Sequence, residues 1–238
     1  MKKILLSAAL LLGALTAFGQ TNFQTFYDFG RKHVTTTLEG FYNDNWGNTF
    51  FFIDYDYNYK DGNTVISPGG TYFEIARCLN FWQNSALAPL SLQLEYNGGM
   101  GMYGYTVAGP IGGFAVNSAF LGGVDFFLHS GDFKNTLNFK LLYKHFVRLH
   151  SQVPFQFTTV WGCQDLFGAP GLRFSGFLDV WCEGNQAVVL SEPQLWYNIG
   201  SLFGCENLHV GGEVELSWNF AGYYGFAVRP CLGTKWVF

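Results

Sequence analysis

Apolar and polar residues alternate strictly along several segments of the chain. In LSLQLEYN, residues 90–97, Leu and Tyr occupy the even positions, while Ser, Gln, Glu and Asn occupy the odd ones. A period of two places the two sets on opposite faces of a β-strand. The same pattern recurs in TLNFKLLYKHF (136–146), GLRFSGFLDVW (171–181) and GGEVELSWNF (211–220). We therefore predict an all-β protein whose strands have one apolar, aromatic-rich face and one charged face.

The spacing of such segments predicts about twelve strands. An even number is normal for closed single-chain barrels of bacteria. Two regions leave ten or fourteen strands open: the glycine-rich segment 98–113, where one strand could be two, and segment 20–32, which could lengthen the first strand or form another. The predicted strands lie near residues 33–42, 48–59, 70–82, 89–97, 111–118, 120–129, 134–147, 153–163, 171–181, 188–199, 207–219 and 224–238.

Composition decides whether the alternating sheet faces water or lipid. Aromatic residues make up 19% of the chain and charged residues only 13%, against roughly 25% charged residues in soluble domains. A soluble sandwich or lipocalin-like barrel, the alternative, would place its charges outside and its aliphatic side chains in a core. The low charge content and the aromatic strand ends favour a transmembrane antiparallel β-barrel with an apolar outer face and a polar lumen.

The first residues have the layout of a secretory signal peptide. Lys2 and Lys3 precede an apolar stretch over 4–15, and small residues follow at Ala17 and Gly19. We predict a signal peptide over 1–19 and one barrel domain over 20–238. Loss of the two lysines moves the formal net charge from −4 to −6, which argues against a nucleic-acid partner.

The chain ends on a predicted strand rather than on a polar tail. In CLGTKWVF, the apolar residues Leu232, Trp236 and Phe238 share one face. Loose polar ends are the rule in soluble domains, because a frayed end buries too little surface to offset its ordering entropy. We predict that this strand closes the barrel, since an open sheet edge is not tolerated in lipid.

A terminal Phe on an alternating strand resembles the signature of outer-membrane β-barrel proteins. The segments that resemble the Tsx-like branch of these proteins, in particular its Bacteroidota members, are TTTLEGFYNDNWGNTFFFIDYDY, EIARCLNFW, LQLEYNGG, DFKNTLNFKLLYK, SEPQLWYN and GGEVELSWNF. The resemblance implies a monomeric twelve-stranded channel for nucleosides in the outer membrane of a Gram-negative bacterium. It also implies membrane lipid and the barrel-assembly machinery as partners.

A lumen that handles nucleosides would offer rings to stack on the base and polar oxygens for the ribose hydroxyls. The predicted inward face supplies both, and the cluster FFFIDYDY places two aromatic and two acidic side chains on one face of one strand. The candidate solute-binding residues are Phe50, Phe52, Asp54, Asp56, Glu39, Glu95, Phe127, Trp196, Glu213 and Arg229. Further inward candidates are Phe177, Trp181, Glu74, Asp125, Asp179, Glu192 and Glu215, with Lys140, Lys144, Arg173 and Lys235 as bases.

The same residues have a structural interpretation. Inward aromatic side chains can fill a barrel of this size, and the acidic and basic residues can form an ion-pair network. One segment departs from the pattern: in YFEIARCLNFW, alternation turns Arg77 toward lipid. Either a bulge turns this arginine inward toward Glu74, or it lies near a membrane interface.

Other function classes have less support in the sequence. A lipid-modifying enzyme needs a nucleophile beside a His base, and the sequence offers only the pairs His129-Ser130 and His150-Ser151, without GxSxG or HExxH. The five Cys show no CxxC spacing, so no metal site and no cofactor is expected. A closed structural or adhesive barrel remains the alternative to a channel.

Overall fold

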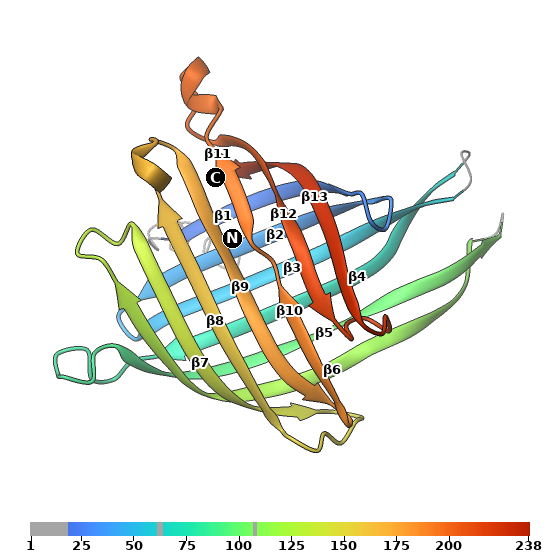
Figure 1. The fold of residues 1–238 in the computed structure, drawn as a ribbon, viewed down its shortest axis with the longest axis horizontal. Coiled ribbons are helices and arrows are strands. Elements are labelled where there is room, and N and C mark those ends of the chain that lie inside the picture. Colours follow the sequence, from blue (N-terminus) through green and yellow to red (C-terminus); the bar gives the residue numbers. More distant parts are fainter. Residues whose placement is uncertain (1–18, 61–63, 107–108) are drawn as a thin grey trace, which may run out of the picture.

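The computed structural model describes residues 19–60, 64–106 and 109–238, which form one β-barrel (Figure 1). The predicted signal peptide lies outside these residues apart from Gly19 and stays a prediction. The strands are β1 (Gly19–Asp28), β2 (His33–Asp44), β3 (Gly47–Lys60), β4 (Thr64–Leu79), β5 (Leu90–Thr106), β6 (Gly109–His129), β7 (Asn135–Phe146), β8 (Phe155–Gln164), β9 (Leu172–Glu183), β10 (Gln186–Ser191), β11 (Gln194–Tyr197), β12 (Leu208–Trp218) and β13 (Phe226–Val237).

The described residues also include two short 3-10 helices, η2 (Leu166–Gly168) and η3 (Gly200–Phe203). Neither is long and apolar enough to cross a membrane.

The sheet closes on itself through its first and last strands. Neighbours from β1 to β9 pair antiparallel in sequence order, and β13 pairs with both β12 and β1. β10 and β11 occupy a single position in the wall, because both pair with β9 on one side and with β12 on the other. The thirteen strands therefore fill twelve positions, which confirms the predicted closed barrel and the role of the C-terminal strand in closing it.

Glu192 and Pro193 interrupt the wall between β10 and β11. Proline has no N–H to donate to a β-ladder, so it ends the strand that precedes it. Backbone groups at the break still form hydrogen bonds with the neighbouring strands. The Glu192 N–H donates to the Phe177 carbonyl (3.1 Å), and the Pro193 carbonyl accepts from the Val214 N–H (3.1 Å).

The open segment 20–32 contains a separate strand, β1, which was one of its two alternatives. The division into strands over 111–118 and 120–129 was wrong, because both belong to the single long strand β6. The added strand and the merged pair cancel in the count. The predicted strand over 188–199 is the interrupted pair β10 and β11.

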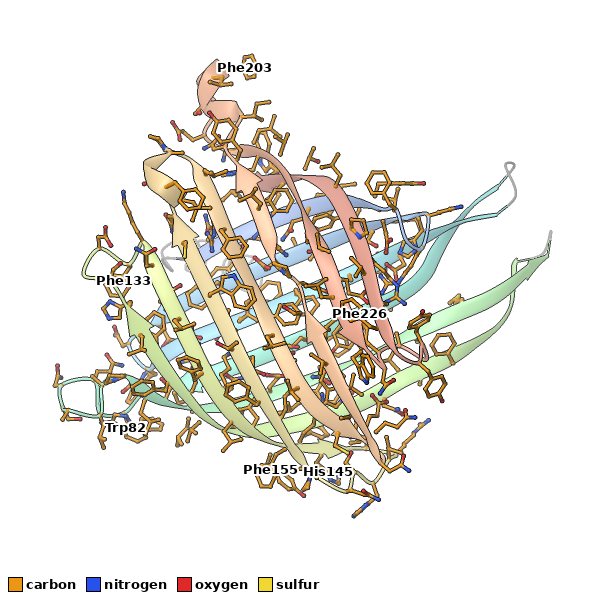
Figure 2. The ribbon with its side chains drawn as sticks, viewed as in Figure 1. Trp82, Phe133, His145, Phe155, Phe203 and Phe226 are labelled. Atoms are coloured by element: carbon orange, nitrogen blue, oxygen red, sulfur yellow. The ribbon has the colours of Figure 1, made fainter. Side chains whose placement is uncertain are left out.

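Side chains alternate between the two sides of the wall as predicted. On β5, Leu92 and Leu94 are exposed outside, whereas Gln93 and Glu95 are buried inside. The exposed outer side chains include aliphatic residues such as Leu141 and many aromatic residues such as Phe139 and Tyr143 beside it. Among the side chains labelled in Figure 2, Trp82, Phe133 and Phe203 lie at the end where β1 begins and β13 ends, and His145, Phe155 and Phe226 lie at the opposite end. We call these the terminal end and the far end.

The β2–β3 turn at the terminal end requires a glycine. Gly47 has φ +143°, and a Cβ there would lie 2.1 Å from the Cys78 carbonyl oxygen, so any other residue would distort the turn. Arg77 lies beside this turn, where its guanidinium donates to Asp44 (2.8 Å) and to Thr49 (3.0 Å). Of the two alternatives for Arg77, the structure therefore supports the second, in which the side chain lies near the end of the barrel. Its hydrogen bonds go to Asp44 and Thr49 and not to Glu74.

An apolar core fills part of the barrel interior. Its members are inward side chains of β6, β7, β9 and β10, and two loops at the far end add Leu149 and Phe220 to it. The Phe220 ring packs edge-on against Trp181, with 6.1 Å between ring centroids. The buried members are Ala119, Leu121, Leu142, Phe146, Trp181 and Val188, which we call the inner apolar cluster.

Candidate functional site

Aromatic side chains form a strip on the inward face of β3 and β4. Phe50 and Phe52 are two residues apart on β3, and their ring centroids lie 5.9 Å apart. Tyr72 of β4 extends the strip, with its ring 5.8 Å from that of Phe52. All three side chains are half-buried. We call Phe50, Phe52 and Tyr72 the aromatic strip.

The two aspartates of the FFFIDYDY cluster follow the aromatic strip along the same face. The Thr37 hydroxyl donates to Asp54 (2.6 Å), and the Thr35 hydroxyl donates to Asp56 (2.7 Å). His33 Nε2 also lies 3.3 Å from Asp56. A threonine of β2 thus holds each aspartate in position, because Thr37 lies opposite Asp54 and Thr35 lies opposite Asp56 in the strand register.

Amide side chains hold two of the predicted glutamates. Asn22 of β1 donates to Glu39 (2.8 Å), while Gln93 and Asn97 of β5 donate to Glu95 (2.7 and 3.1 Å). Fixed carboxylates of this kind keep free lone pairs that can accept hydrogen bonds from a solute.

The Trp196 side chain points inward but is packed against the barrel wall, so it does not reach the open part of the lumen. The side chain is 1% exposed, its indole N–H donates to Gln194 (2.9 Å), and its ring lies 5.5 Å from that of Phe26. The Lys235 ammonium lies over the same ring at 4.3 Å. Since Gln194 also donates to Glu213 (2.8 Å), Trp196 positions polar neighbours and offers little face to a solute.

Arg229 belongs to a charged network at the far end. It donates to Glu215, which also accepts from Arg31 of the β1–β2 turn. Arg31 in turn pairs with Asp28 at 2.9 Å. This network connects β1, β12 and β13, so its first role is to tie the strands on both sides of the closure together.

Phe127 lies on β6, which is separated from β4 by the single strand β5, and it is near the terminal end. Its ring stacks on His129 at 5.3 Å, and His129 stacks on Phe133 of the β6–β7 loop at 3.9 Å. Two groups of rings therefore face the lumen from different strands: the aromatic strip on β3 and β4, and this stack at the end of β6.

The inward lysines do not form the predicted ion pairs. Lys140 donates to the Gln93 side-chain oxygen (2.8 Å), and Lys144 donates to that of Gln156 (2.7 Å). Among the described residues, direct ion pairs within the lumen are confined to Arg31, Arg229 and His33 and their acidic partners. An ion-pair network is thus present at the far end around Glu215, whereas the lysines take part in a network of amide side chains.

Several residues of this inward face were missed in the sequence. Asn22 and Gln24 lie on β1, which the sequence left undecided as a separate strand, and Gln93 and Gln156 carry no charge to draw attention. Tyr72 could have been found, because it shares the parity of Glu74 on the same strand.

Neither predicted Ser-His pair has the geometry of a catalytic pair. The Ser130 hydroxyl donates to Asp132 (2.6 Å), and the Ser151 hydroxyl donates to the Cys182 carbonyl (2.6 Å). Within the described part of the chain, no cluster of three metal-ligating side chains is present, and all five Cys are unpaired.

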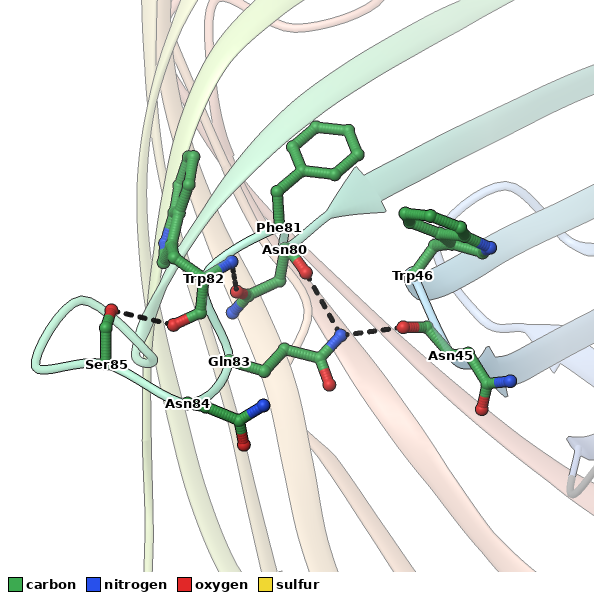
Figure 3. A pocket seen from close by; sticks show the side chains of 8 residues that line it. All are labelled: Asn45, Trp46, Asn80, Phe81, Trp82, Gln83, Asn84 and Ser85. Carbon is green, nitrogen blue, oxygen red and sulfur yellow. Dashed lines mark hydrogen bonds between the residues drawn. The ribbon is translucent and has the colours of Figure 1, made fainter.

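Two hollows lie outside the lumen. One, of about 360 Å³, is formed at the terminal end by the β2–β3 turn and the β4–β5 loop. Its loop is held by Gln83, which donates to the carbonyls of Asn45 and Asn80 (Figure 3). The other, of about 600 Å³, is an apolar hollow on the outer face of β9, β11, β12 and β13.

The sequence profile of a family described as "Domain of unknown function (DUF5020)" matches residues 16–238. The chain belongs to the DUF5020 family. The match covers every described strand, so the whole barrel is the family domain. No curated protein matches the DUF5020 chain.

Solved structures of porins resemble the DUF5020 barrel. The KdgM porin aligns with a TM-score of 0.52 at 9% sequence identity, over 92% of this chain and 99% of the porin. OccK2 (OpdF) of Pseudomonas aeruginosa aligns with TM-scores of 0.39 (15% identity, 90% of this chain, 61% of that one) and, in complex with glucuronate, 0.42 (10% identity, 92% and 96%). The likeness to KdgM shows that the DUF5020 chain has a porin-like fold, and at this identity it shows nothing about the solute.

Proposed function

We propose that the protein is an outer-membrane channel for facilitated diffusion of small solutes, and that its solutes are nucleosides. The observation that carries the proposal is the aromatic strip beside Asp54 and Asp56 on one inward face. Weak stacking sites next to fixed hydrogen-bond acceptors suit a solute with a flat base and a hydroxylated sugar.

The outer face supports the membrane location. Exposed side chains such as Leu94 and Leu232 would be costly in water, and they suit contact with acyl chains. The resemblance to Tsx-like channels and the porin-like fold agree with this location. A channel must bind its solute well enough to select and loosely enough to release, and short-range stacking provides such weak sites.

Replacing Phe50 and Phe52 with Ala is expected to reduce adenosine flux at low concentration. Each lost stacking contact should cost about 1 to 3 kcal/mol of binding per base. Arabinose flux should stay the same or rise, because a sugar does not depend on stacking and the lumen becomes wider. The measurement is solute-specific swelling of liposomes that contain the purified protein.

The matched control is Phe73→Ala, which removes a ring from the outward face of β4, where it packs on Tyr96 at 5.5 Å. This variant should transport adenosine as the unmodified protein does. Equal entry of adenosine and arabinose through the unmodified protein would contradict nucleoside selectivity and leave a nonselective pore.

A closed structural barrel is the second candidate, and the inner apolar cluster favours it. Leu142 and Ala119 are 0% exposed although they point inward, and Phe220 covers part of the cluster from the β12–β13 loop. Apolar side chains that fill a lumen exclude water and ions from that part of its section.

Replacing Phe220 with Ala is expected to raise the single-channel conductance, since it opens the loop side of the inner apolar cluster. Tyr224→Ala in the same loop is the control, because Tyr224 is 73% exposed. Planar-bilayer recordings measure both. A conductance that is zero in the unmodified protein and in Phe220→Ala would instead support the closed barrel.

A further inference from the structure

Seven carboxylates face one another around the lumen. Glu74 of β4 lies opposite the buried Asn97 in the register, Glu95 of β5 is buried, and Asp179 of β9 accepts a hydrogen bond from Thr158 on the same inward side. Asp54 of β3 and Glu213 of β12 also point inward, where Thr37 and Gln194 donate to them. The set, which we call the carboxylate ring, is Glu39, Asp54, Glu74, Glu95, Asp179, Glu192 and Glu213.

Neutral side chains donate hydrogen bonds to most carboxylates of the ring and hold them in position. The donors to Glu39, Glu95 and Glu213 are amide side chains. The donors to Asp54 and Asp179 are the hydroxyls of Thr37 and Thr158. Neutral donors orient a carboxylate without cancelling its charge, so each carboxylate of the ring that is ionised contributes its negative charge to the lumen.

The lysines near the ring do not neutralise it. Lys140 and Lys144 donate to glutamine oxygens, and Lys235 lies over the Trp196 ring. Among described residues, none of the seven carboxylates is within ion-pair distance of a base. Even with these three lysines and the inward Arg173 of β9 counted, the seven carboxylates are in excess by three.

The far-end network shows the opposite arrangement in the same barrel. There, Asp28 and Glu215 are paired directly with Arg31 and Arg229. The chain therefore neutralises its carboxylates where they tie strands together and leaves them unpaired where they line the middle of the lumen.

A buried acceptor without a partner lies beside the ring. Gln24 is 1% exposed, and its side-chain oxygen has no hydrogen-bond partner among described residues. Its register neighbours are Thr37, which binds Asp54, and Lys235. This buried carbonyl oxygen is therefore a further hydrogen-bond acceptor on the inward face, available to a donor from a solute.

We propose that the lumen selects solutes by charge: it passes cations and neutral solutes and excludes anions. The inference rests on the proposed channel and deepens it. A ring of unpaired carboxylates in a narrow, low-dielectric lumen concentrates cations and raises the barrier to anions. Nucleosides, which are uncharged near neutral pH, pass this filter, whereas their phosphorylated forms and sugar acids do not.

The test is the reversal potential of the purified protein in a planar bilayer under a KCl gradient at about 0.1 M. We expect K⁺ to be preferred over Cl⁻ by roughly tenfold or more, and the preference to fall in high salt, because salt screens the ring. Liposome swelling should show the same preference for glucose over glucuronate, which have similar size and differ in charge.

Variants test whether the carboxylate ring causes the preference for K⁺ over Cl⁻. Asp54→Asn with Glu213→Gln should lower the K⁺ preference several-fold, while Asp132→Asn, in the exposed β6–β7 loop, should leave it unchanged. Heat-modifiable migration on gels checks that each variant is folded.

The outcomes separate the two proposals. Conductance without charge preference, or with preference for Cl⁻, overturns the charge filter and leaves the channel standing. Absence of conductance overturns the channel and the filter together.

Discussion

Deletion of Trp236–Phe238 is expected to abolish insertion into the outer membrane and heat-modifiable migration. These residues complete the closure: Trp236 pairs with Phe23 and Val237 with Asn22. The Phe238 N–H donates to the Thr21 carbonyl (2.9 Å), and Asn207 donates to the Val237 carbonyl. Without them, backbone groups of β1 and β12 remain unpaired in lipid, at a cost of several kcal/mol for each group.

Cell fractionation and gels run with and without heating measure this effect. The matched control deletes Leu202 and Phe203, which are exposed in η3 and lie outside the sheet. The control should insert normally. Normal insertion of the terminal deletion would show that closure does not depend on the last residues.

Changing Leu141 to Arg is expected to destabilise the barrel by about 2 to 4 kcal/mol. Leu141 lies in the middle of β7, points outward and is 53% exposed. In a membrane its neighbours are acyl chains, and a guanidinium there has no hydrogen-bond partner. Urea unfolding in lipid vesicles measures the free energy of unfolding.

Asn138→Arg on the same strand is the control for the inward face. Asn138 donates to both oxygens of Asp125, at 2.9 and 3.0 Å, and an arginine can keep this contact to the carboxylate. Its cost should therefore be much smaller. Equal costs at the two positions would mean that the polar face is outside, as in a soluble barrel.

The fold was largely predictable because alternation alone assigns the two faces of a strand. It succeeded at β5, β7 and β12, where the two sets of side chains differ sharply in polarity. It left β1 undecided between a separate strand and an extension of the next one, because its inward face mixes Asn22 and Gln24 with the apolar Phe26. It divided β6 in two at Ala119, close to the point where the pairing of β6 with β5 shifts its register.

The chemistry of the lumen was less predictable, because it depends on which strands lie opposite each other. The sequence identified Lys140 and several carboxylates as inward residues, but Lys140 binds Gln93, which is 47 residues away. Periodicity also says nothing about loops, so the entry of Leu149 and Phe220 into the inner apolar cluster could not be expected.

The break at Pro193 sets where the barrel wall is least stable. β10 and β11 have 6 and 4 residues, whereas every other strand has at least 10. Local unfolding costs less when fewer hydrogen bonds open together. We therefore expect the amide hydrogens of β10 and β11 to exchange with solvent sooner than those of neighbouring strands. Thermal fluctuation of the wall should be concentrated at this one position, next to Glu192 of the carboxylate ring.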